Sequence, residues 1–421
     1  MIPLPLDEVR ALDLGVLDGE GEVTSVKADS REAGPGDLFV ALNSGVRFVD
    51  EARARGAATL LPRDQEAALA TLASLVRAKS TADVVAVVGS AGKTTTKDIL
   101  GALCAPHVAT IWAEKSLNNE IGLPLTVCRL ESETRVLVTE MGMRGLGQVA
   151  ALCSIARPTL AVVPHIGPEH LELLGTVERV AEANAEAIDA LPAEGVAVVP
   201  EQSPLDPFLD RDDVEIRRFS PADIEVERLL TRFTVGRETV ELALPFTQRH
   251  LMANTLAALH AYDALGLPLD RAADGVERIS LSPWRGEEIQ LPGGGFVVND
   301  AYNANPDSMR AALVHLEERA AGRRKVAILG EMAELGDRSA AYHDRIGELA
   351  AELGIDVIGV GETARNYEPA AWVASAADVA EVAREYVRPG DAVLVKASRA
   401  VGLEGIADQI ANFARAWSLS S

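Results

Sequence analysis

The sequence predicts an α/β protein divided into three domains. Two series of short, unbroken apolar runs alternate with stretches of helical periodicity, a pattern that is typical of parallel strands covered by helices on both faces. The chain of 421 residues is also too long for one ordinary hydrophobic core. The expected domains are residues 1–81, 82–282 and 283–421. The apolar runs are 84–88, 136–139, 160–163 and 196–199 in the first series, and 296–298, 326–329, 357–360 and 392–395 in the second.

The first domain and a stretch late in the second domain depart from this alternation. The segment "VTSVKADSREAGPGDLFVAL" predicts two strands on either side of a Gly-Pro-Gly turn. The region 204–245, which contains "IEVERLLTRFTVGRETVELALP", predicts an antiparallel excursion from the parallel sheet. The sequence contains no internal repeat of fixed period and no low-complexity tract.

The composition disfavours two classes of protein. A formal charge of −23, from 40 basic and 63 acidic residues, argues against a general binder of nucleic acids or anionic membranes, because such proteins need basic surface to displace counterions. No run of about 18 apolar residues could span a bilayer, and the N-terminus has no basic segment followed by an apolar one. The three cysteines form no CxxC pair, which favours a reduced, cytoplasmic compartment.

A shortened phosphate-binding loop follows the first apolar run. The residues are Gly89, Ser90, Ala91, Gly92, Lys93 and Thr94, and the usual longer pattern would require glycine where Val87 stands. Glycines let backbone N–H groups face phosphate, and the following helix adds its positive end. Lys93 can reach the terminal phosphates and Thr94 can hold Mg²⁺. The loop, with Thr95, therefore predicts a site for ATP and Mg²⁺, although a merely structural strand-to-helix turn is the alternative.

Acidic and histidine side chains follow the next two runs, at the sheet edge where open parallel sheets bind ligands. Glu140 ends the second run, where Mg²⁺ beside a nucleotide would take a further ligand. A solvated carboxylate is the alternative. His165, Glu169 and His170 crowd just after the third run, in "PHIGPEHLELLG". We expect at least one of them to contact a metal or a phosphate, although each histidine alone is more often structural.

The residues at these strand ends resemble the Mur ligases of peptidoglycan synthesis. The similarity runs from about residue 25 to the C-terminus. Of the similar segments, "DAYNANPDSMRAAL" is the most specific to one type within the family, the type that joins D-Ala-D-Ala to UDP-N-acetylmuramoyl-tripeptide. That family uses the shortened loop. The similar segments are "GSAGKTTTKDIL", "KSLNNEIGLP", "EMGMRGLGQVA", "HLELLGTVERVA", "NDAYNANPDSMRAAL" and "LGEMAELG".

The resemblance implies a fold and a reaction. The N-terminal α/β domain would grip a UDP-sugar, the central domain would bind ATP, and a Rossmann-like C-terminal domain would act as a lid that brings the amine. ATP would phosphorylate a peptide carboxylate to an acyl phosphate, which the amine then attacks. Cations, in-line positioning and exclusion of water matter more for this chemistry than acid–base catalysis. A cytoplasmic, monomeric enzyme that serves cell wall biogenesis, cell shape and cell division is implied.

The resemblance also assigns roles to particular residues. The implied catalytic residues are Lys93, Glu140, His170 and Arg285. The implied Mg²⁺ ligands are Thr94 and Glu140 for one ion and His170 for a second. Asn254 would face adenine, and Asp300 would bind the ribose hydroxyls. The implied substrate-binding residues are Asn118 and Asn119 in "SLNNEIG", and Ser30 and Arg31 in "ADSR" for the UDP moiety.

One departure from the family pattern concerns Asn184. Mur ligases carry a carbamylated lysine at this place, whose carboxylate binds the second Mg²⁺, and this chain has no lysine from 116 to 324. Val177, Val180, Ala181, Asn184 and Ile188 share one helical face, so Asn184 should point inward. Its amide oxygen could serve the metal, Glu169 could take over that task, or Asn184 could form only a local hydrogen bond.

Two further departures leave the substrates open. The stretch 43–57 is shorter than the family loop that contacts the UDP-sugar, and Leu251 replaces an asparagine near Asn254. Two alternatives therefore remain beside the D-Ala-D-Ala ligase. The first is a Mur-type amide ligase with other substrates, and the second is a non-catalytic ATP-binding relative that lacks the carbamylated lysine.

Overall fold

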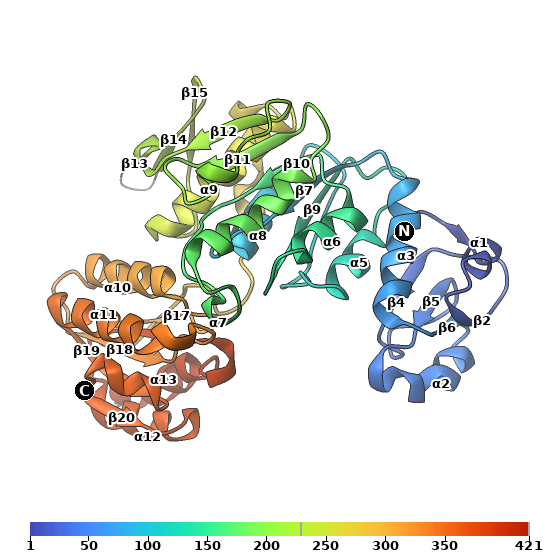
Figure 1. Ribbon diagram of the computed structural model, residues 1–421. Coiled ribbons are helices and arrows are strands. Elements are labelled where there is room, and N and C mark those ends of the chain that lie inside the picture. The colour runs from blue at the N-terminus through green and yellow to red at the C-terminus, as the bar shows by residue number, and fades with distance from the viewer. Residues whose placement is uncertain (228–229, 420–421) are drawn as a thin grey trace. The chain divides into compact units, whose positions relative to one another are not determined.

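The computed structural model describes residues 1–227 and 230–419, and it confirms the α/β class. The chain forms two compact units, and Figure 1 follows it through both by colour. Unit 1 comprises Met1–His165, Glu182–Pro245 and Ala253–Ser280, whereas unit 2 comprises Ile166–Ala181, Phe246–Met252 and the chain from Leu281 onward. The three-domain division with boundaries after residues 81 and 282 stays a prediction.

A six-stranded parallel sheet forms the centre of unit 1. All four apolar runs of the first series are strands of this sheet, because side chains buried on both faces must be apolar. In spatial order the strands are β12 (Glu215–Phe219), β11 (Val196–Pro200), β10 (Leu160–Val162), β7 (Asp83–Val87), β9 (Val136–Glu140) and β8 (Thr110–Trp112). The loop after β7 therefore lies between its neighbours β10 and β9, at the carboxyl edge of the sheet.

Helices cover both faces of this sheet. The crossover from β7 to β8 runs in the opposite direction to those from β8 to β9, β9 to β10 and β10 to β11. Right-handed crossovers therefore place α4 on one face and α5, α6 and α8 on the other, and Figure 1 shows the last three in front of the sheet. The helices are α4 (Lys93–Cys104), α5 (Gly122–Val127), α6 (Gln148–Ala156), α8 (Val177–Asp189) and α9 (Arg249–Ala264).

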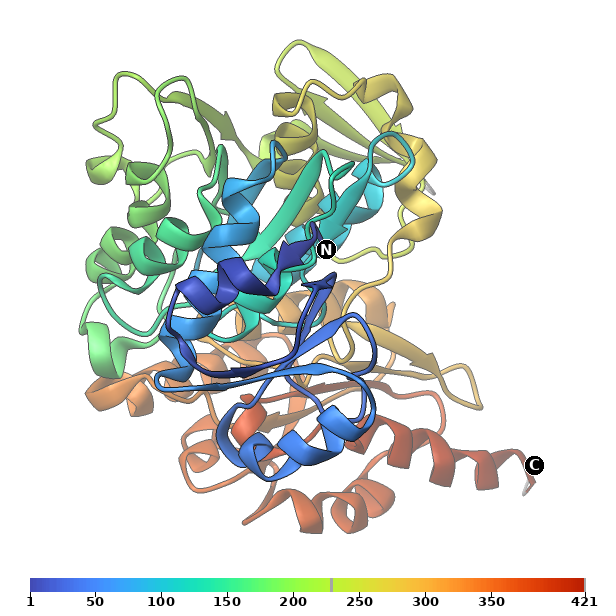
Figure 2. The same cartoon turned by 90° about the vertical axis from the view of Figure 1, so that its right-hand side faces the viewer.

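The N-terminal part of unit 1 has its own sheets, drawn in blue in Figure 2. The two strands predicted around the Gly-Pro-Gly turn are β4 and β5, which pair in parallel. The four-stranded sheet contains β2 (Gly15–Asp18), β6 (Ala58–Pro62), β5 (Asp37–Val40) and β4 (Ser25–Lys27), and β1 (Leu4–Pro5) pairs with β3 (Glu22–Val23). The helices are α1 (Leu6–Ala11), α2 (Val49–Ala54) and α3 (Gln65–Ala78).

The antiparallel excursion is confirmed, but it begins later than residue 204. β12 pairs in parallel with β11 and extends the central sheet, so only the chain after it turns away. The excursion is a three-stranded antiparallel sheet of β13 (Ile224–Glu227), β14 (Leu230–Val235) and β15 (Glu238–Leu242).

Unit 2 is built on a second six-stranded sheet, which contains every run of the second series. Five strands are parallel, and β16 adds to the edge in the antiparallel direction. In spatial order they are β16 (Glu287–Gln290), β17 (Phe296–Asn299), β21 (Ala392–Lys396), β18 (Lys325–Gly330), β19 (Ile355–Val360) and β20 (Ala371–Val373). The helices are α7 (Leu171–Leu174), α10 (Pro306–Ala320), α11 (Ser339–Glu352), α12 (Ala376–Tyr386) and α13 (Ile406–Ala414).

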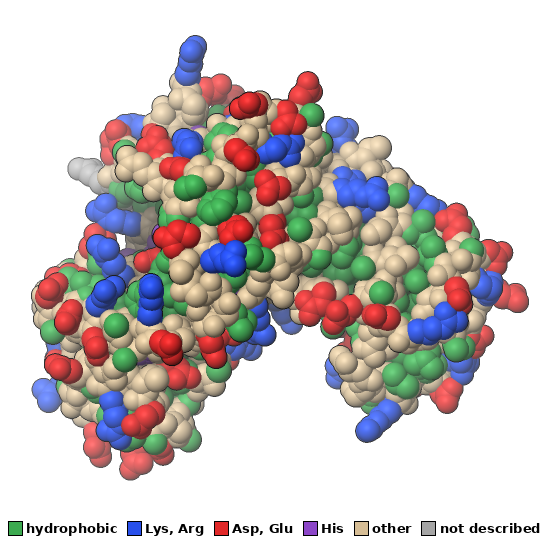
Figure 3. All heavy atoms as spheres, viewed as in Figure 1, with side chains coloured by type: hydrophobic (Ala, Val, Ile, Leu, Met, Phe, Trp, Pro, Cys, Tyr) green, Lys and Arg blue, Asp and Glu red, His purple; other side chains and the backbone are tan. Residues whose placement is uncertain are grey.

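The surface carries charged side chains of both signs, as the composition of 40 basic and 63 acidic residues leads one to expect. On the face shown in Figure 3, acidic and basic side chains are interspersed. Within the described residues, no helix has the length and apolar character needed to cross a membrane. The three cysteines, Cys104, Cys128 and Cys153, are free and buried.

Candidate nucleotide and metal site

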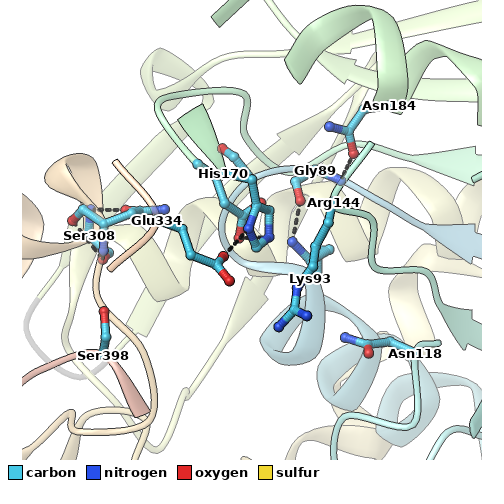
Figure 4. Close-up of polar contacts among 12 residues, drawn as sticks. Gly89, Lys93, Asn118, Arg144, His170, Asn184, Ser308, Glu334 and Ser398 are labelled. Carbon is cyan, nitrogen blue, oxygen red and sulfur yellow. Dashed lines mark hydrogen bonds and ion pairs between the residues drawn. The ribbon is translucent and has the colours of Figure 1, made fainter. Parts of the chain in front are cut away.

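The phosphate loop connects the end of β7 to the start of α4, as predicted. Gly89 and Gly92 have φ of +120° and +82°, a left-handed region that favours glycine. A Cβ atom on Gly92 would also lie 2.4 Å from Oδ1 of Asn254. Because α4 begins at Lys93, its first amides and its positive end belong to the loop. Lys93 Nζ donates a hydrogen bond to the Gly89 carbonyl (Figure 4).

Neighbouring residues complete the loop. The amide N–H of Ser90 donates to the carbonyl of His165 at 2.9 Å, so the chain after β10 supports the loop through its backbone. Thr94 and Thr95 are buried in the first turn of α4. Asn254 is buried on α9 beside Gly92, which brings this predicted adenine contact to the loop. A glycine-rich loop that leads into the first turn of a helix and carries one lysine is suited to a chain of phosphates.

Asn184 holds the first amide of the loop. Its side chain is 1% exposed, which confirms that it points inward from α8. Its Oδ1 accepts a hydrogen bond from the N–H of Gly89 at 2.6 Å (Figure 4). The amide oxygen of Asn184 is therefore engaged with the backbone of the phosphate loop, which is a structural role of the kind considered for this residue beside metal binding.

Glu140 is a buried carboxylate with one engaged oxygen. The side chain ends β9 and is 1% exposed. Its Oε1 accepts a hydrogen bond from Nδ2 of Asn118 at 2.7 Å. Among the described residues, Oε2 has no hydrogen-bond partner. A buried carboxylate oxygen without a partner is costly, and a cation beside it would remove that cost.

The residues of unit 1 therefore fit a hard cation such as Mg²⁺. Mg²⁺ prefers oxygen ligands and usually takes one or two from protein, with phosphates and water completing the shell. Glu140 Oε2 and the hydroxyl of Thr94 would be the protein oxygens. Within the described part of the chain, no three His, Cys, Asp or Glu side chains come together as a metal site of their own.

The two asparagines of the predicted substrate loop have contacts inside unit 1. The Asn118 carbonyl accepts from the N–H of Gly142 at 2.8 Å, in addition to the side-chain contact with Glu140. Asn119 Oδ1 accepts from the N–H of Gly122 at 2.9 Å and so satisfies the start of α5. Their role toward a substrate stays a prediction.

His170 belongs to unit 2, where a glutamate orients its ring. Its backbone is left-handed, with φ of +51°, at the start of α7. The Nδ1 atom is in contact with the carboxylate of Glu334 (Figure 4). The Nε2 atom lies 3.9 Å from Oε1 of Glu169. The backbone N–H of Glu172 also donates to the Glu334 carbonyl at 3.0 Å. A carboxylate that holds Nδ1 fixes the tautomer that presents Nε2 to a ligand.

The segment that carries Glu334 is held by a buried histidine. His343 Nε2 accepts the N–H of Met332 at 3.0 Å, and Nδ1 lies 2.7 Å from the Ser339 carbonyl. These two contacts require the neutral ring with its proton on Nδ1. Burial lowers the pKa of His343, partly offset by the backbone contact with Ser339.

Acid is expected to destabilise this segment through His343. The folded-state pKa of His343 lies below the ordinary value. The neutral ring therefore contributes its full stabilisation of the folded protein above about pH 6.5, and this contribution is lost as the pH falls below that value. The free energy of unfolding should fall by about 1–2 kcal/mol between pH 7.5 and pH 5.0, because the unfolded chain then binds a proton at this ring that the folded protein does not bind. Urea unfolding at pH 7.5 and pH 5.0 measures this for the wild type and for His343→Gln. An equal acid loss in both proteins would contradict it.

Asp300 is paired with a lysine at the end of β21. Lys396 Nζ lies 2.6 Å from Asp300 Oδ2 and donates to the Asn303 carbonyl at 2.9 Å. Lys396 is almost completely buried. The pair holds the segment after β17 in one conformation. This segment contains Asp300, the predicted ribose contact.

Arg285 lies over an aromatic ring. Its guanidinium carbon is 4.0 Å from the ring centroid of Tyr302. Arg399 approaches the same ring, at 5.3 Å, and the ring of Trp284, at 4.9 Å. Trp284 itself has a left-handed backbone, with φ of +62°. Stacking of this kind fixes the plane of the guanidinium group.

The predicted UDP-binding residues lie in the N-terminal part of unit 1. Ser30 is buried, whereas Arg31 is exposed and contacts Asp29 at 2.5 Å. Hydrogen bonds from the Arg31 side chain and backbone lower the pKa of Asp29 to about 2. Arg31 is thus available at the surface, oriented by a neighbouring carboxylate.

The predicted residues fall into two sets. Unit 1 contains the phosphate loop, Glu140, Asn118, Asn119, Asn254, Ser30 and Arg31, and unit 2 contains His170, Arg285 and Asp300. The convergence of the two sets on one nucleotide stays a prediction. Sequence reasoning missed Glu334 and Lys396. Signals existed for both, since Glu334 lies in the quoted segment "LGEMAELG" and Lys396 is one of only seven lysines and ends an apolar run.

Two family models match the chain. The Mur ligase middle domain matches residues 87–262, and the family described as Mur ligase, glutamate ligase domain, matches residues 284–399. The first match contains the phosphate loop and Glu140, and the second contains Arg285 and Asp300.

Curated relatives and solved structures extend the similarity over almost the whole chain. The UDP-N-acetylmuramoyl-tripeptide--D-alanyl-D-alanine ligase of Escherichia coli (strain K12) is 34% identical over 96% of this chain and 98% of its own. The crystal structure of MurF from Acinetobacter baumannii has a TM-score of 0.84 at 26% identity, covering 97% of this chain and 99% of that chain. MurF from Thermotoga maritima, in complex with ADP, has a TM-score of 0.81 at 28% identity, covering 93% and 98%.

Proposed function

This chain belongs to the Mur ligase family, and we propose that it is an ATP-dependent amide ligase that joins D-alanyl-D-alanine to UDP-N-acetylmuramoyl-tripeptide. The observation that carries the proposal is the match to relatives of that name over almost the whole chain, including the parts outside the ATP-binding unit. The phosphate loop and the buried carboxylate of Glu140 support the ATP-dependent step. The product amide would contribute to peptidoglycan synthesis, and so to cell wall biogenesis, cell shape and cell division.

The proposed reaction has two steps. A carboxylate oxygen of the tripeptide attacks the γ-phosphorus of ATP, the bond to the bridging oxygen breaks, and ADP leaves with an acyl phosphate formed. The amine of D-Ala-D-Ala then attacks the acyl carbon, and phosphate leaves as the amide forms. Both steps place negative charge on phosphate oxygens, so cationic groups and oriented amides lower the barrier. Bound Mg²⁺ would supply further positive charge.

In unit 1 the loop would hold the phosphates. Lys93 would exchange its contact with the Gly89 carbonyl for the terminal phosphate oxygens, and the amides at the start of α4 would bind the others. Thr94 and Glu140 would hold Mg²⁺, and Asn254 would contact the adenine. Asn118 and Asn119, with Ser30 and Arg31, would face the UDP-muramoyl substrate.

In unit 2 three residues would complete the site. His170, oriented by Glu334, would present Nε2 to a second metal ion or to a phosphate, and Arg285 would neutralise phosphate charge. Asp300 would accept hydrogen bonds from the ribose, in the position set by Lys396. We propose the C-terminal domain, residues 283–421, as a lid whose closure excludes water. A cytoplasmic, monomeric protein completes the proposal.

Phosphate release from ATP by the purified protein tests the function. Release is expected only when both UDP-N-acetylmuramoyl-tripeptide and D-Ala-D-Ala are present. Release that requires other carboxylate and amine substrates would favour a Mur-type ligase of different specificity, as the short stretch 43–57 would permit. ATP binding without phosphate release, whatever acceptor is added, would establish the non-catalytic alternative.

Bicarbonate is expected to have no effect on this activity. A lysine needs carbon dioxide to become a carbamate, but Asn184 cannot be carbamylated, and its oxygen is bonded to the Gly89 amide. The measurement is phosphate release with and without added bicarbonate in degassed buffer. Asn184→Lys should either acquire a bicarbonate response or show none. Loss of wild-type activity on removing bicarbonate would contradict the expectation.

A further inference from the structure

Lys97 is a buried cation with three anionic or carbonyl partners. The side chain is 0% exposed and lies on α4, four residues after Lys93. Its Nζ donates to the carbonyls of Ala113 and Lys115, at 2.6 and 2.7 Å, and lies 2.8 Å from Oδ1 of Asp98. A lysine ammonium has three N–H donors, so its hydrogen-bonding capacity is fully used.

The two carbonyls belong to one segment that is shaped to meet this lysine. Ala113 follows β8, and its N–H donates to the Val138 carbonyl of β9 at 3.0 Å. Lys115 has a left-handed backbone, with φ of +50°, which is uncommon for a residue with a side chain. The turn at Lys115 brings two carbonyls that are two residues apart to the same ammonium group.

The same segment leads to the candidate metal ligand. Three residues after Lys115, Asn118 donates from Nδ2 to Glu140 Oε1 at 2.7 Å and accepts from the N–H of Gly142 at 2.8 Å. A Cβ on Gly142 would lie 3.1 Å from the Asn118 amide, so the two pack closely. One chain of contacts thus runs from α4 through residues 113–118 to the carboxylate of Glu140.

A buried lysine is a poor choice if stability is the only requirement. Apolar residues of similar volume in place of a buried ion pair are often neutral or stabilising. An ammonium group does what an apolar side chain cannot, because it orients carbonyls at hydrogen-bonding distance. We propose that Lys97 is a positioning residue that couples the phosphate-loop helix to Glu140, through residues 113–118 and the side chain of Asn118. The metal part of this inference rests on the proposed function.

The test is the effect of Mg²⁺ on ADP binding to the full chain. Isothermal titration gives the Kd of ADP with and without Mg²⁺. The Kd without Mg²⁺ divided by the Kd with Mg²⁺ measures how well the metal site is formed. In Lys97→Met this ratio should fall about tenfold, while the Kd without Mg²⁺ changes by less than about threefold. Lys79→Met is the matched control, since the Lys79 side chain forms an ion pair with Glu8 and lies outside the site. Its ratio should equal that of the wild type.

Two further variants separate positioning from mere folding. Lys97→Gln keeps two N–H donors, so its ratio should fall less than that of Lys97→Met. It also provides the measurement if Lys97→Met does not fold. Asn118→Ala breaks the chain of contacts at its other end and should lower the ratio as Lys97→Met does. In the double variant Lys97→Met/Asn118→Ala the loss should not exceed that of the larger single variant.

The outcomes distinguish this inference from the proposed function. A wild-type ratio in both Lys97 variants, even with lowered thermal stability, would overturn the positioning role and leave the ligase proposal intact. Losses that multiply in the double variant would overturn it as well. A wild-type protein that binds ADP with the expected Mg²⁺ dependence but has no ligase activity would overturn only the proposed function.

Discussion

Replacing Lys93 with methionine is expected to lower the turnover number for ATP-dependent ligation by about a hundred- to a thousandfold, the usual effect of removing one group that stabilises transition-state charge. The contact of Lys93 Nζ with the Gly89 carbonyl holds the ammonium group over the loop. A hydrogen bond from the ammonium group to a neutral carbonyl is weaker than one to a phosphate anion, so the lysine can exchange partners when the nucleotide enters.

Steady-state kinetics and a binding titration measure this effect. Methionine keeps the length of the side chain, and the Lys93 side chain is partly exposed, so thermal stability should change little. The Kd of ATP should rise by less than the turnover number falls, because negative charge develops on the bridging oxygen of the departing ADP only in the transition state, where the lysine stabilises it. Lys79→Met is again the control. Turnover within about threefold of the wild type would show that the loop is only a structural turn.

The strands could be predicted from the sequence because burial on both faces imposes unbroken apolar runs. Each of the eight runs is a strand, and Glu140 lies at a strand end as expected. The inward orientation of Asn184 also followed from a local property, the helical spacing of its apolar neighbours. β12 escaped prediction as a sheet strand because its sequence, "EIRRF", is mostly polar, as suits a strand at the edge of the sheet.

The supporting contacts could not be predicted, because each joins segments that are far apart in the chain. Glu334 lies 164 residues from His170, Lys396 lies 96 residues from Asp300, and Asn184 lies 95 residues from Gly89. Helical or strand periodicity says which face of an element a side chain occupies, but not which element covers that face. The motifs therefore predict the residues that would meet the nucleotide, whereas only the structure identifies the residues that hold them in place.

Stability and activity should change in opposite directions when Glu140 is replaced with glutamine. Glutamine has the same shape and can still accept the hydrogen bond from Asn118 Nδ2, but it carries no charge. In the absence of Mg²⁺ the free energy of unfolding should stay the same or rise by about 1 kcal/mol, because a buried carboxylate oxygen without a partner is removed. Turnover should fall by about a hundredfold or more, since an anionic ligand for Mg²⁺ is lost.

Urea unfolding without Mg²⁺ and a Mg²⁺ titration of the ligase rate measure the two effects of Glu140→Gln. Glu133→Gln is the matched control, because Glu133 is exposed in the same unit, and it should change neither quantity appreciably. The Mg²⁺ concentration needed for half-maximal rate should rise in Glu140→Gln and stay the same in the control. If Glu140→Gln instead loses stability and keeps its activity, the carboxylate is structural, and its free oxygen serves no metal. A gain in stability together with a loss of rate would identify Glu140 as a buried metal ligand. Selection for the reaction would then have kept a charge that folding alone does not favour.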